Sequence, residues 1–159
     1  MSDRTQQIHR FARAIPNPAA GAELAVRPDG GRAWRILNMI FTFTASAVVA
    51  NRNIQLNLSD GNTRTWRGTT AVVQAAASVQ EYEAYPNAIS GVSVSGLALL
   101  ALPIDGLWMP PGYVLTTTTA LIDVGDQYSG IALDLVELET GPEYYGEPSI
   151  EYNRVPLNQ

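Results

Sequence analysis

The stretch Asn53-Ile54-Gln55-Leu56-Asn57-Leu58-Ser59 alternates polar and apolar residues without a break. Successive side chains of a β-strand point to opposite faces, so the apolar side chains share one face of this stretch and the amides share the other. This pattern predicts a half-buried strand of an antiparallel sheet, because such sheets commonly cover one face and leave the other in water. Residues 129–138 alternate in the same way and predict a second strand of this kind.

Turn signals divide the rest of the chain at intervals of strand length. Asp29-Gly30-Gly31 and Asp60-Gly61-Asn62 each separate two stretches that favour strands, which is typical of β-hairpins. The alanines of residues 71–84 favour a helix, but threonines and valines in and beside this stretch favour a strand, and we prefer the strand. Eight strands are predicted, at residues 23–27, 33–44, 53–59, 63–69, 72–85, 92–102, 113–123 and 129–138.

Strands without interleaved helices predict an all-β fold, an antiparallel β-sandwich or jelly roll of about eight strands, because a lone sheet must bury its apolar face on a second one. We assign this domain to residues 22–138. Residues 1–21 contain two prolines and no sustained periodicity, so we expect an extended N-terminal arm, with a short amphipathic helix over residues 6–14 as the alternative. Residues 139–159 hold three prolines, two glycines and four glutamates, and we expect an acidic C-terminal tail.

Charge is distributed unevenly along the chain, although the net charge is only −5. Residues 1–67 carry nine of the arginines against four acids, a net charge of +5, whereas residues 68–159 carry one arginine against eleven acids, a net charge of −10. Dispersed arginines in an acidic chain favour complementary contacts between subunits over nucleic-acid binding. We expect no nucleic-acid partner, and no membrane partner because a run of about 20 predominantly apolar residues is missing.

Residues 68–122 are poor in charge, with Glu81, Glu83 and Asp105 as their only charged side chains. A typical domain has about a quarter of its residues charged, and protein interfaces are depleted of charge at their cores. A monomer coated with serine and threonine is one interpretation. We prefer a homo-oligomer, with a trimer favoured, in which this stretch forms the subunit contacts.

The chemistry that the chain lacks gives the firmest evidence on function. The chain has no cysteine and no lysine, and His9 is its only histidine. These absences exclude disulfides, thiolate and multi-histidine metal sites, phosphate-binding P-loops and Schiff-base chemistry. We therefore expect a protein that is not an enzyme and has neither a cofactor nor a metal site.

One pair of glutamates remains as a catalytic candidate. Glu137 and Glu139 stand two residues apart in a predicted strand, about 7 Å between Cα atoms, and this separation is compatible with glycoside hydrolysis. We prefer a solvated face for both, with Val136 and Leu138 turned inward.

Asp123 and Asp126 flank Gly125 in a predicted loop. Carboxylates in a loop can hold calcium, but the spacing of an EF-hand is missing. We prefer a role for both side chains in stabilising the turn.

Aromatic residues supply candidate contacts with a partner. Trp34 and Trp66 lie within predicted strands and are interpreted as core residues. Trp108, Tyr144 and Tyr145 lie outside the predicted strands and are interpreted as exposed contact residues. Such side chains could stack on a sugar or anchor a neighbouring subunit.

Four short motifs occur in order along residues 22–138. They are Phe41-Thr42-Phe43-Thr44, then Val49-Ala50-Asn51-Arg52, then Leu107 with Pro110-Pro111-Gly112-Tyr113, and Gly125-Asp126-Gln127-Tyr128-Ser129 before Ile131-Ala132-Leu133. This succession resembles small β-sandwich virion proteins of tailed bacteriophages. The resemblance implies a head or tail component of the virion and transfers no active-site residue.

The resemblance and the composition together lead us to expect a non-enzymatic virion structural protein, assembled in the host cytoplasm. Within that class we favour a capsid decoration (cement) protein that stabilises the head. Its partner would be the major capsid protein or another virion protein, with Arg4, Arg10 and Arg13 of the arm meeting an acidic shell surface. A tail or connector component and a lectin-like module for host attachment are the alternatives.

Overall fold

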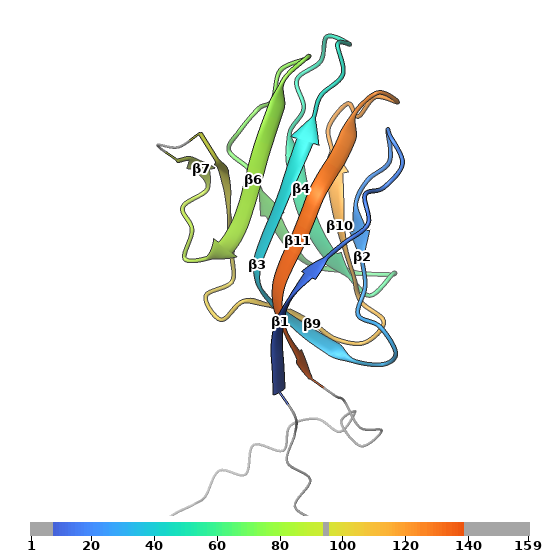
Figure 1. Cartoon of the computed structure of the whole chain (residues 1–159), viewed down its shortest axis with the longest axis vertical. Coiled ribbons are helices and arrows are strands. Elements are labelled where there is room, and N and C mark those ends of the chain that lie inside the picture. The colour runs from blue at the N-terminus through green and yellow to red at the C-terminus, as the bar shows by residue number, and fades with distance from the viewer. Residues whose placement is uncertain (1–7, 94–95, 139–159) are drawn as a thin grey trace, which may run out of the picture.

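The structure is a computed structural model and describes residues 8–93 and 96–138. Its strands form two sheets that pack face to face (Figure 1). The seven-stranded sheet holds, in order, β1 (Ile8–Ala14), β11 (Gln127–Leu138), β3 (Ala33–Thr44), β6 (Val79–Pro86), β8 (Ala98–Leu102) and β7 (Gly91–Val92), with β9 (Leu107–Met109) also paired to β3. The four-stranded sheet holds β2 (Ala25–Val26), β10 (Val114–Thr119), β4 (Ile54–Ser59) and β5 (Arg64–Thr69).

The connections between the two sheets identify the fold. We treat the short strands β7, β8 and β9 as an insertion between β6 and β10, which leaves eight strands with the first and the last, β1 and β11, side by side. The sheet orders β1-β11-β3-β6 and β2-β10-β4-β5 are those of a jelly roll. The predicted all-β sandwich is therefore confirmed, and among the described strands the one parallel pair is β6 with β8.

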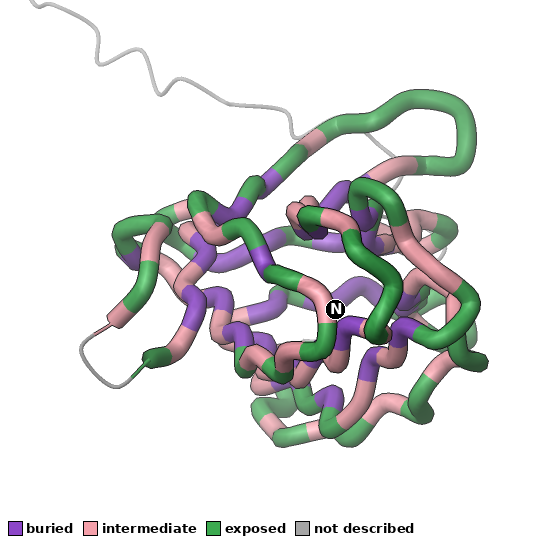
Figure 2. Tube along the Cα trace, turned by 90° about the horizontal axis from the view of Figure 1, so that it is seen from above, coloured by how far each residue is buried: buried purple, intermediate pink, exposed green. Residues whose placement is uncertain are grey.

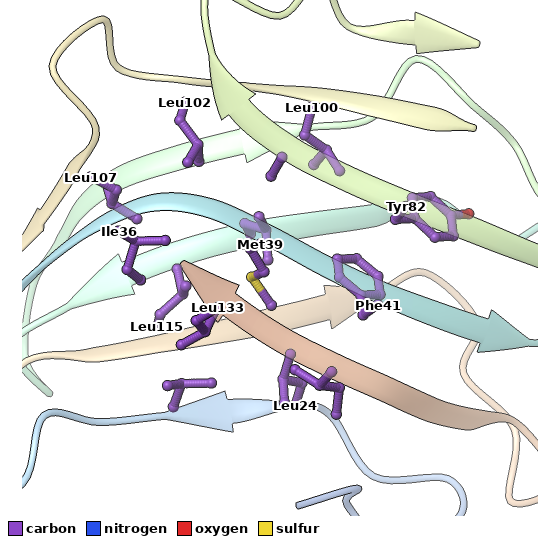
Figure 3. Packing of buried hydrophobic residues seen from close by; sticks show 14 of the residues in the cluster. Leu24, Ile36, Met39, Phe41, Tyr82, Leu100, Leu102, Leu107, Leu115 and Leu133 are labelled. Carbon is purple, nitrogen blue, oxygen red and sulfur yellow. The ribbon is translucent and has the colours of Figure 1, made fainter. Parts of the chain in front are cut away.

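The core lies between the two sheets and is built by alternation along the strands. Ile54, Leu56 and Leu58 of β4 are buried, as the alternating pattern predicts. Phe41 of β3 and Tyr82 of β6 lie side by side with their rings stacked at 5.0 Å between centroids (Figure 3). Each fully buried large apolar side chain contributes about 1.5–3 kcal/mol to folding, so this layer is the main source of stability.

Two predicted strands differ from the observed ones. The prediction for residues 72–85 is too long, because residues 70–78 form a loop around the buried side chain of Gln74 and β6 begins only at Val79. The prediction for residues 92–102 merges β7 and β8, which pair with each other. By contrast, the prediction for residues 33–44 coincides with β3.

Residues 8–14, expected to belong to an extended N-terminal arm, form β1 at the edge of the larger sheet. Its register runs from Ile8 opposite Leu138 to Ala14 opposite Ala132. A strand forms here because isolated helices shorter than about 12 residues are marginal, whereas the edge of β11 offers backbone hydrogen-bonding partners. The rest of the expected arm up to residue 7 and the expected tail lie outside the described residues. No helix in the described part is long and apolar enough to cross a membrane.

The long strands define two ends of the sandwich. Thr44 of β3 pairs with Val79 and with Gln127, so the loops of residues 45–53, 70–78 and 120–126 gather at one end, the upper end in Figure 1. The beginning of β3 and the strand β9 lie at the opposite end. Viewed along the long axis, buried positions lie between the layers and exposed positions follow the loops (Figure 2).

Candidate interaction surfaces

Arg52 and Asp126 form an ion pair beneath two of the gathered loops. Neither side chain is exposed to solvent, and Arg52 Nε donates to Asp126 Oδ2 at 2.8 Å. The other guanidinium nitrogens donate to the carbonyls of Val48 and Ala50 and to Ser46 Oγ, each at 3.0 Å. A buried ion pair is tolerated when additional hydrogen bonds satisfy its remaining polar groups, as they do here.

The carboxylate of Asp126 is also satisfied by donors from the protein. It accepts the backbone N–H of Ser46 at 2.7 Å and that of Asp123 at 2.8 Å. Burial alone raises the pKa of Asp126, but the hydrogen bonds from Arg52 and from these backbone groups outweigh burial and hold the pKa below its ordinary value. Asp126 is therefore ionised at neutral pH and committed to the loop structure.

Asp123 completes the turn at residues 123–126, where a turn was predicted in preference to a calcium site. Its Oδ1 accepts from Ser46 Oγ and from the N–H of Gly125, each at 3.0 Å. The turn-stabilising interpretation of Asp123 and Asp126 is confirmed. Within residues 8–93 and 96–138, no group of three or more His, Cys, Asp or Glu side chains is placed to hold a metal ion.

Gln74 attaches the third loop, residues 70–78, to the same cluster. Its backbone exchanges two hydrogen bonds with that of Arg52, at 2.9 and 2.8 Å. Its buried side chain accepts from the hydroxyl of Tyr82 and donates to the carbonyl of Phe43, both at 2.9 Å. The three loops are therefore tied into one unit.

The outer surface of this unit is apolar and almost free of charge. Five large apolar side chains of the three loops are 53–94% exposed, and we call them the apolar tip: Val48, Val49, Val73, Leu121 and Val124. The charged residues of the same loops are the buried pair of Arg52 with Asp126, and Asp123, which is held by hydrogen bonds. Leu121 has a positive φ of 55°, a costly conformation for a bulky residue that persists only where the surrounding structure imposes it.

The expected contact region, residues 68–122, supplies only part of the apolar tip. It contributes Val73 and Leu121, whereas Val48, Val49 and Val124 come from outside it. Local sequence could not join these loops, because the pairing of β3 with β6 and β11 brings them together. One feature of the sequence indicated this surface: the apolar run of residues 47–50 between two predicted strands.

A pocket of about 370 Å³ lies at the opposite end of the sandwich, between β5 and β9. Trp66, Trp108 and Tyr113 line it, together with Pro103 and Pro110. The structure thus brings three aromatic side chains from separate strands and loops onto one concave surface.

The three tryptophans differ in their surroundings. Trp34 is fully buried, as expected of a core residue, and Trp108 is 41% exposed, as predicted, while its role in contacts stays a prediction. Trp66, interpreted as core, is half-buried: it packs against the core and also lines the pocket. Its ring lies over Gly68, where an added Cβ would come within 2.6 Å of the ring. Glycine at this position therefore lets the indole lie flat along β5.

Glu137 points into the protein, which corrects the solvated face expected for it. It is 7% exposed and accepts hydrogen bonds from Trp34 Nε1 at 3.0 Å and from Arg32 Nη1 at 2.5 Å. The alternation that buries Leu135 also turns Glu137 inward, while Val136, expected to point inward, lies half-buried on the other face. A buried indole N–H needs an acceptor, and Glu137 supplies it.

Arg10 and Arg13, expected to meet a partner, make contacts within the chain. Arg10 donates to both carboxylate oxygens of Asp134, at 3.2 Å from Nε and 2.7 Å from Nη2, and these bonds lower the pKa of Asp134. Arg13 donates to Asp29 at 2.5 Å, and its guanidinium carbon lies 4.8 Å from the ring centroid of Trp34. Both ion pairs are partly exposed, so they hold β1 to the domain only weakly.

The remaining candidates from the sequence lie outside the described residues. They are Arg4, Glu139, Tyr144 and Tyr145. The binding role expected of Arg4, Tyr144 and Tyr145 and the solvated position expected of Glu139 stay predictions.

Comparisons with known proteins give little similarity. No family model matches the chain, and no curated protein matches it. A chain from the structure of infectious bursal disease virus, Gx strain, aligns with 89% of this chain and 42% of that chain, at 12% sequence identity and a TM-score of 0.27. This chain thus spans less than half the length of the viral chain, and the evidence for the fold is the strand order described above.

Proposed function

We propose that this chain is a non-enzymatic structural subunit of a virion, of the capsid-decoration type, that attaches to a protein partner through the apolar tip. The fold supports the class by analogy alone, since viral capsid and lectin domains commonly use the jelly roll. The partner would be the major capsid protein or another virion protein. The subunits would form a small homo-oligomer, a trimer in the simplest case.

The apolar tip is the observation that carries this proposal. Val49 and Val124 are 94 and 80% exposed on neighbouring loops. Exposed apolar patches on soluble proteins mark interaction sites, and interface cores are depleted of charge as this surface is. Burying such a side chain against a partner contributes about 1.5 kcal/mol or more.

The hydrogen-bonded loops beneath the apolar tip favour a protein interface. The buried pair of Arg52 with Asp126 and the hydrogen bonds of Gln74 hold the loops before any partner arrives. Binding therefore avoids the cost of ordering mobile side chains, about 0.5–1.5 kcal/mol each.

The buried acids in the described part of the chain also support a structural role. Asp126 pairs with Arg52, and Glu137 accepts the indole N–H of Trp34. Their carboxylate oxygens accept hydrogen bonds that join loops and strands, as expected of a structural subunit.

The test is co-sedimentation of the purified chain with particles of its virus that lack it. The double variant Val49→Asp with Val124→Asp should bind about tenfold more weakly or worse, because each aspartate would be buried without a partner. Ile89→Asp is the matched control, since Ile89 is 86% exposed on the loop after β6, away from the tip.

Circular dichroism melts of all three proteins check that the fold is retained. Equal binding by the wild type and the double variant would overturn the role of the tip. Failure of the wild type to bind the particles would overturn the decoration function itself.

A further inference from the structure

The pocket between β5 and β9 lies at the end of the sandwich opposite the apolar tip, and the proposed function leaves it unused. We propose that the pocket receives the C-terminal segment of the same chain, centred on residues 142–148. This inference is independent of the proposed function, because no residue of the apolar tip lines the pocket.

The pocket has the chemistry of a groove for short extended peptides. Trp66, Trp108 and Tyr113 supply aromatic faces, and its volume of about 370 Å³ suits a few side chains. Aromatic-lined grooves recognise proline-containing segments, which are already extended and lose little conformational freedom on binding.

An exposed arginine of β5 borders the pocket. Arg64 stands directly before Thr65 and Trp66, which line the pocket, and it has no ion-pair partner among the described residues. Arg67 pairs with Asn57 and donates to Gln55 Oε1 at 3.4 Å, so it lies on the other face of β5. Arg64 gives this rim of the pocket a positive charge, which favours an occupant that carries negative charge.

A second arginine, Arg35, borders the other wall. Arg35 lies opposite Trp108 in the pairing of β3 with β9. Its side chain runs beside Gly106, where an added Cβ would come 3.4 Å from Arg35 Cγ, and Gly106 itself lines the pocket. Arg35 likewise has no ion-pair partner within the described residues, and Asp105 is the one acid between residues 103 and 113.

The C-terminal segment matches both the aromatic walls and the basic rim. Residues 142–148 read Pro142-Glu143-Tyr144-Tyr145-Gly146-Glu147-Pro148, so prolines and tyrosines alternate with acids. Residues 139–159 carry four glutamates and one arginine, a net charge of −3. Tyrosine and proline would fill the pocket while the glutamates meet the arginines.

The strand β11 delivers the segment to the correct end of the molecule. Trp108, Arg35 and Val136 form one row across β9, β3 and β11, about 10 Å from first to last at the usual strand spacing. Leu138 ends β11 two residues later, and the six residues from there to Tyr144 span up to about 20 Å. A tether this short gives an effective concentration in the mM range, which favours the chain's own segment over that of a second copy.

The test is acrylamide quenching of tryptophan fluorescence in the full chain. Trp34 is fully buried, so quenching reports on Trp66 and Trp108 of the pocket. The double variant Tyr144→Ala with Tyr145→Ala should raise the quenching constant about twofold. A segment that fills the pocket shields most of its wall, and the variant would lose that shielding. Tyr152→Ala is the matched control, a tyrosine of the same tail outside residues 142–148, and should leave quenching unchanged.

A charge variant tests the rim separately. Arg35→Glu should also raise the quenching constant, because it repels the glutamates of the segment. Arg27→Glu changes an exposed arginine that directly follows β2, at the edge of the four-stranded sheet opposite β5, and should leave the quenching constant at its wild-type value.

Three outcomes would overturn the inference. The first is unchanged quenching in the double tyrosine variant. The second is protection of the tryptophans from quenching that disappears on dilution while the sedimenting mass falls. This result would assign the occupant to a second copy of the chain. The third is added protection of the full chain by oligosaccharides, which would make the pocket a sugar site.

Discussion

The guanidinium of Arg52 donates to a carboxylate, two carbonyls and a hydroxyl, with no exposure to water. Removing it would leave the carboxylate of Asp126 buried without its cation. It would also free the carbonyls that position Val48 and Ala50. One side chain thus couples the stability of the fold to the shape of the apolar tip.

Arg52→Ala should therefore lower the free energy of unfolding by about 3–5 kcal/mol, the usual cost of breaking a buried ion pair. Urea denaturation measures this loss. Arg27→Ala, at an exposed arginine without an ion-pair partner in the described structure, is the control and should leave stability unchanged. Equal stability of the two variants would contradict the role given to Arg52.

The burial of the Tyr82 phenol predicts a loss of stability at high pH. Burial raises its pKa from 10.0 to about 12, so the unfolded chain gives up this proton first. The stability that the neutral phenol contributes is complete below pH 10 and is lost as the pH rises to about 12. Urea denaturation across this window should show a steep fall, which Tyr82→Phe makes shallower. A stability that stays constant with pH in the wild type would refute the assignment.

Burial also raises the pKa of Tyr128, so the Tyr82→Phe variant should keep part of the fall. Tyrosinate absorbance measured beside the denaturation curves separates ionisation in the folded state from unfolding.

At the scale of the elements, alternation predicted the strands that cover the core and missed two strands whose own sequence carries no such pattern. The strands β3, β4 and β11 were found because each buries every second side chain over several residues. The strand β1 was missed because its sequence is rich in arginine, and its strand structure comes from pairing with β11. The strand β9 has only three residues between turn-forming segments.

The candidate surfaces were harder to predict than the strands, because they depend on tertiary packing. The exposure of Trp108 was predicted, and its role in contacts stays a prediction. Trp66 was assigned to the core, and it packs against the core while also lining the pocket beside Gly68. The inward direction of Glu137 follows from the alternation through Leu135 and could have been read from the sequence. Its burial depends on Trp34, which supplies the hydrogen bond.

Because β1 is a strand of the sheet, its backbone should be protected from solvent. The N–H groups of β1 that bond to β11 should exchange with deuterium far more slowly than those of an extended arm. Hydrogen exchange read by mass spectrometry over residues 8–14 measures this. Exchange at the rate of an unstructured peptide would contradict the placement of β1.

A substitution at Gly106 tests how closely the turn before β9 packs against β3. It has a φ of +84°, and an added Cβ would lie 2.7 Å from the carbonyl oxygen of Ile36. Gly106→Ala should cost about 1–3 kcal/mol of stability, because the backbone of β3 would have to move. Gly112→Ala is the matched control, since Gly112 has the same φ and nothing within 4 Å of the added Cβ. Equal losses in thermal or urea denaturation would show that the contact with Ile36 has no effect.

At the scale of the whole molecule, the uneven charge of the sequence is partly used within the chain. The ion pairs of Arg10 with Asp134, and of Arg32 with Glu137, join the basic first part of the chain to its acidic last part, as the buried pair of Arg52 does. Folding as a jelly roll places these segments side by side. What distinguishes the two ends is therefore surface chemistry: an apolar tip at one and an aromatic pocket with a basic rim at the other.

The most direct test of the proposed function is a cryo-electron microscopy map of the particle into which we propose that this protein assembles. We expect the sandwich to stand with residues 45–53, 70–78 and 120–126 against a neighbouring protein. Val49 and Val124, now exposed, should be buried there. A map in which these loops face solvent, and the subunit attaches through another surface, would contradict the account.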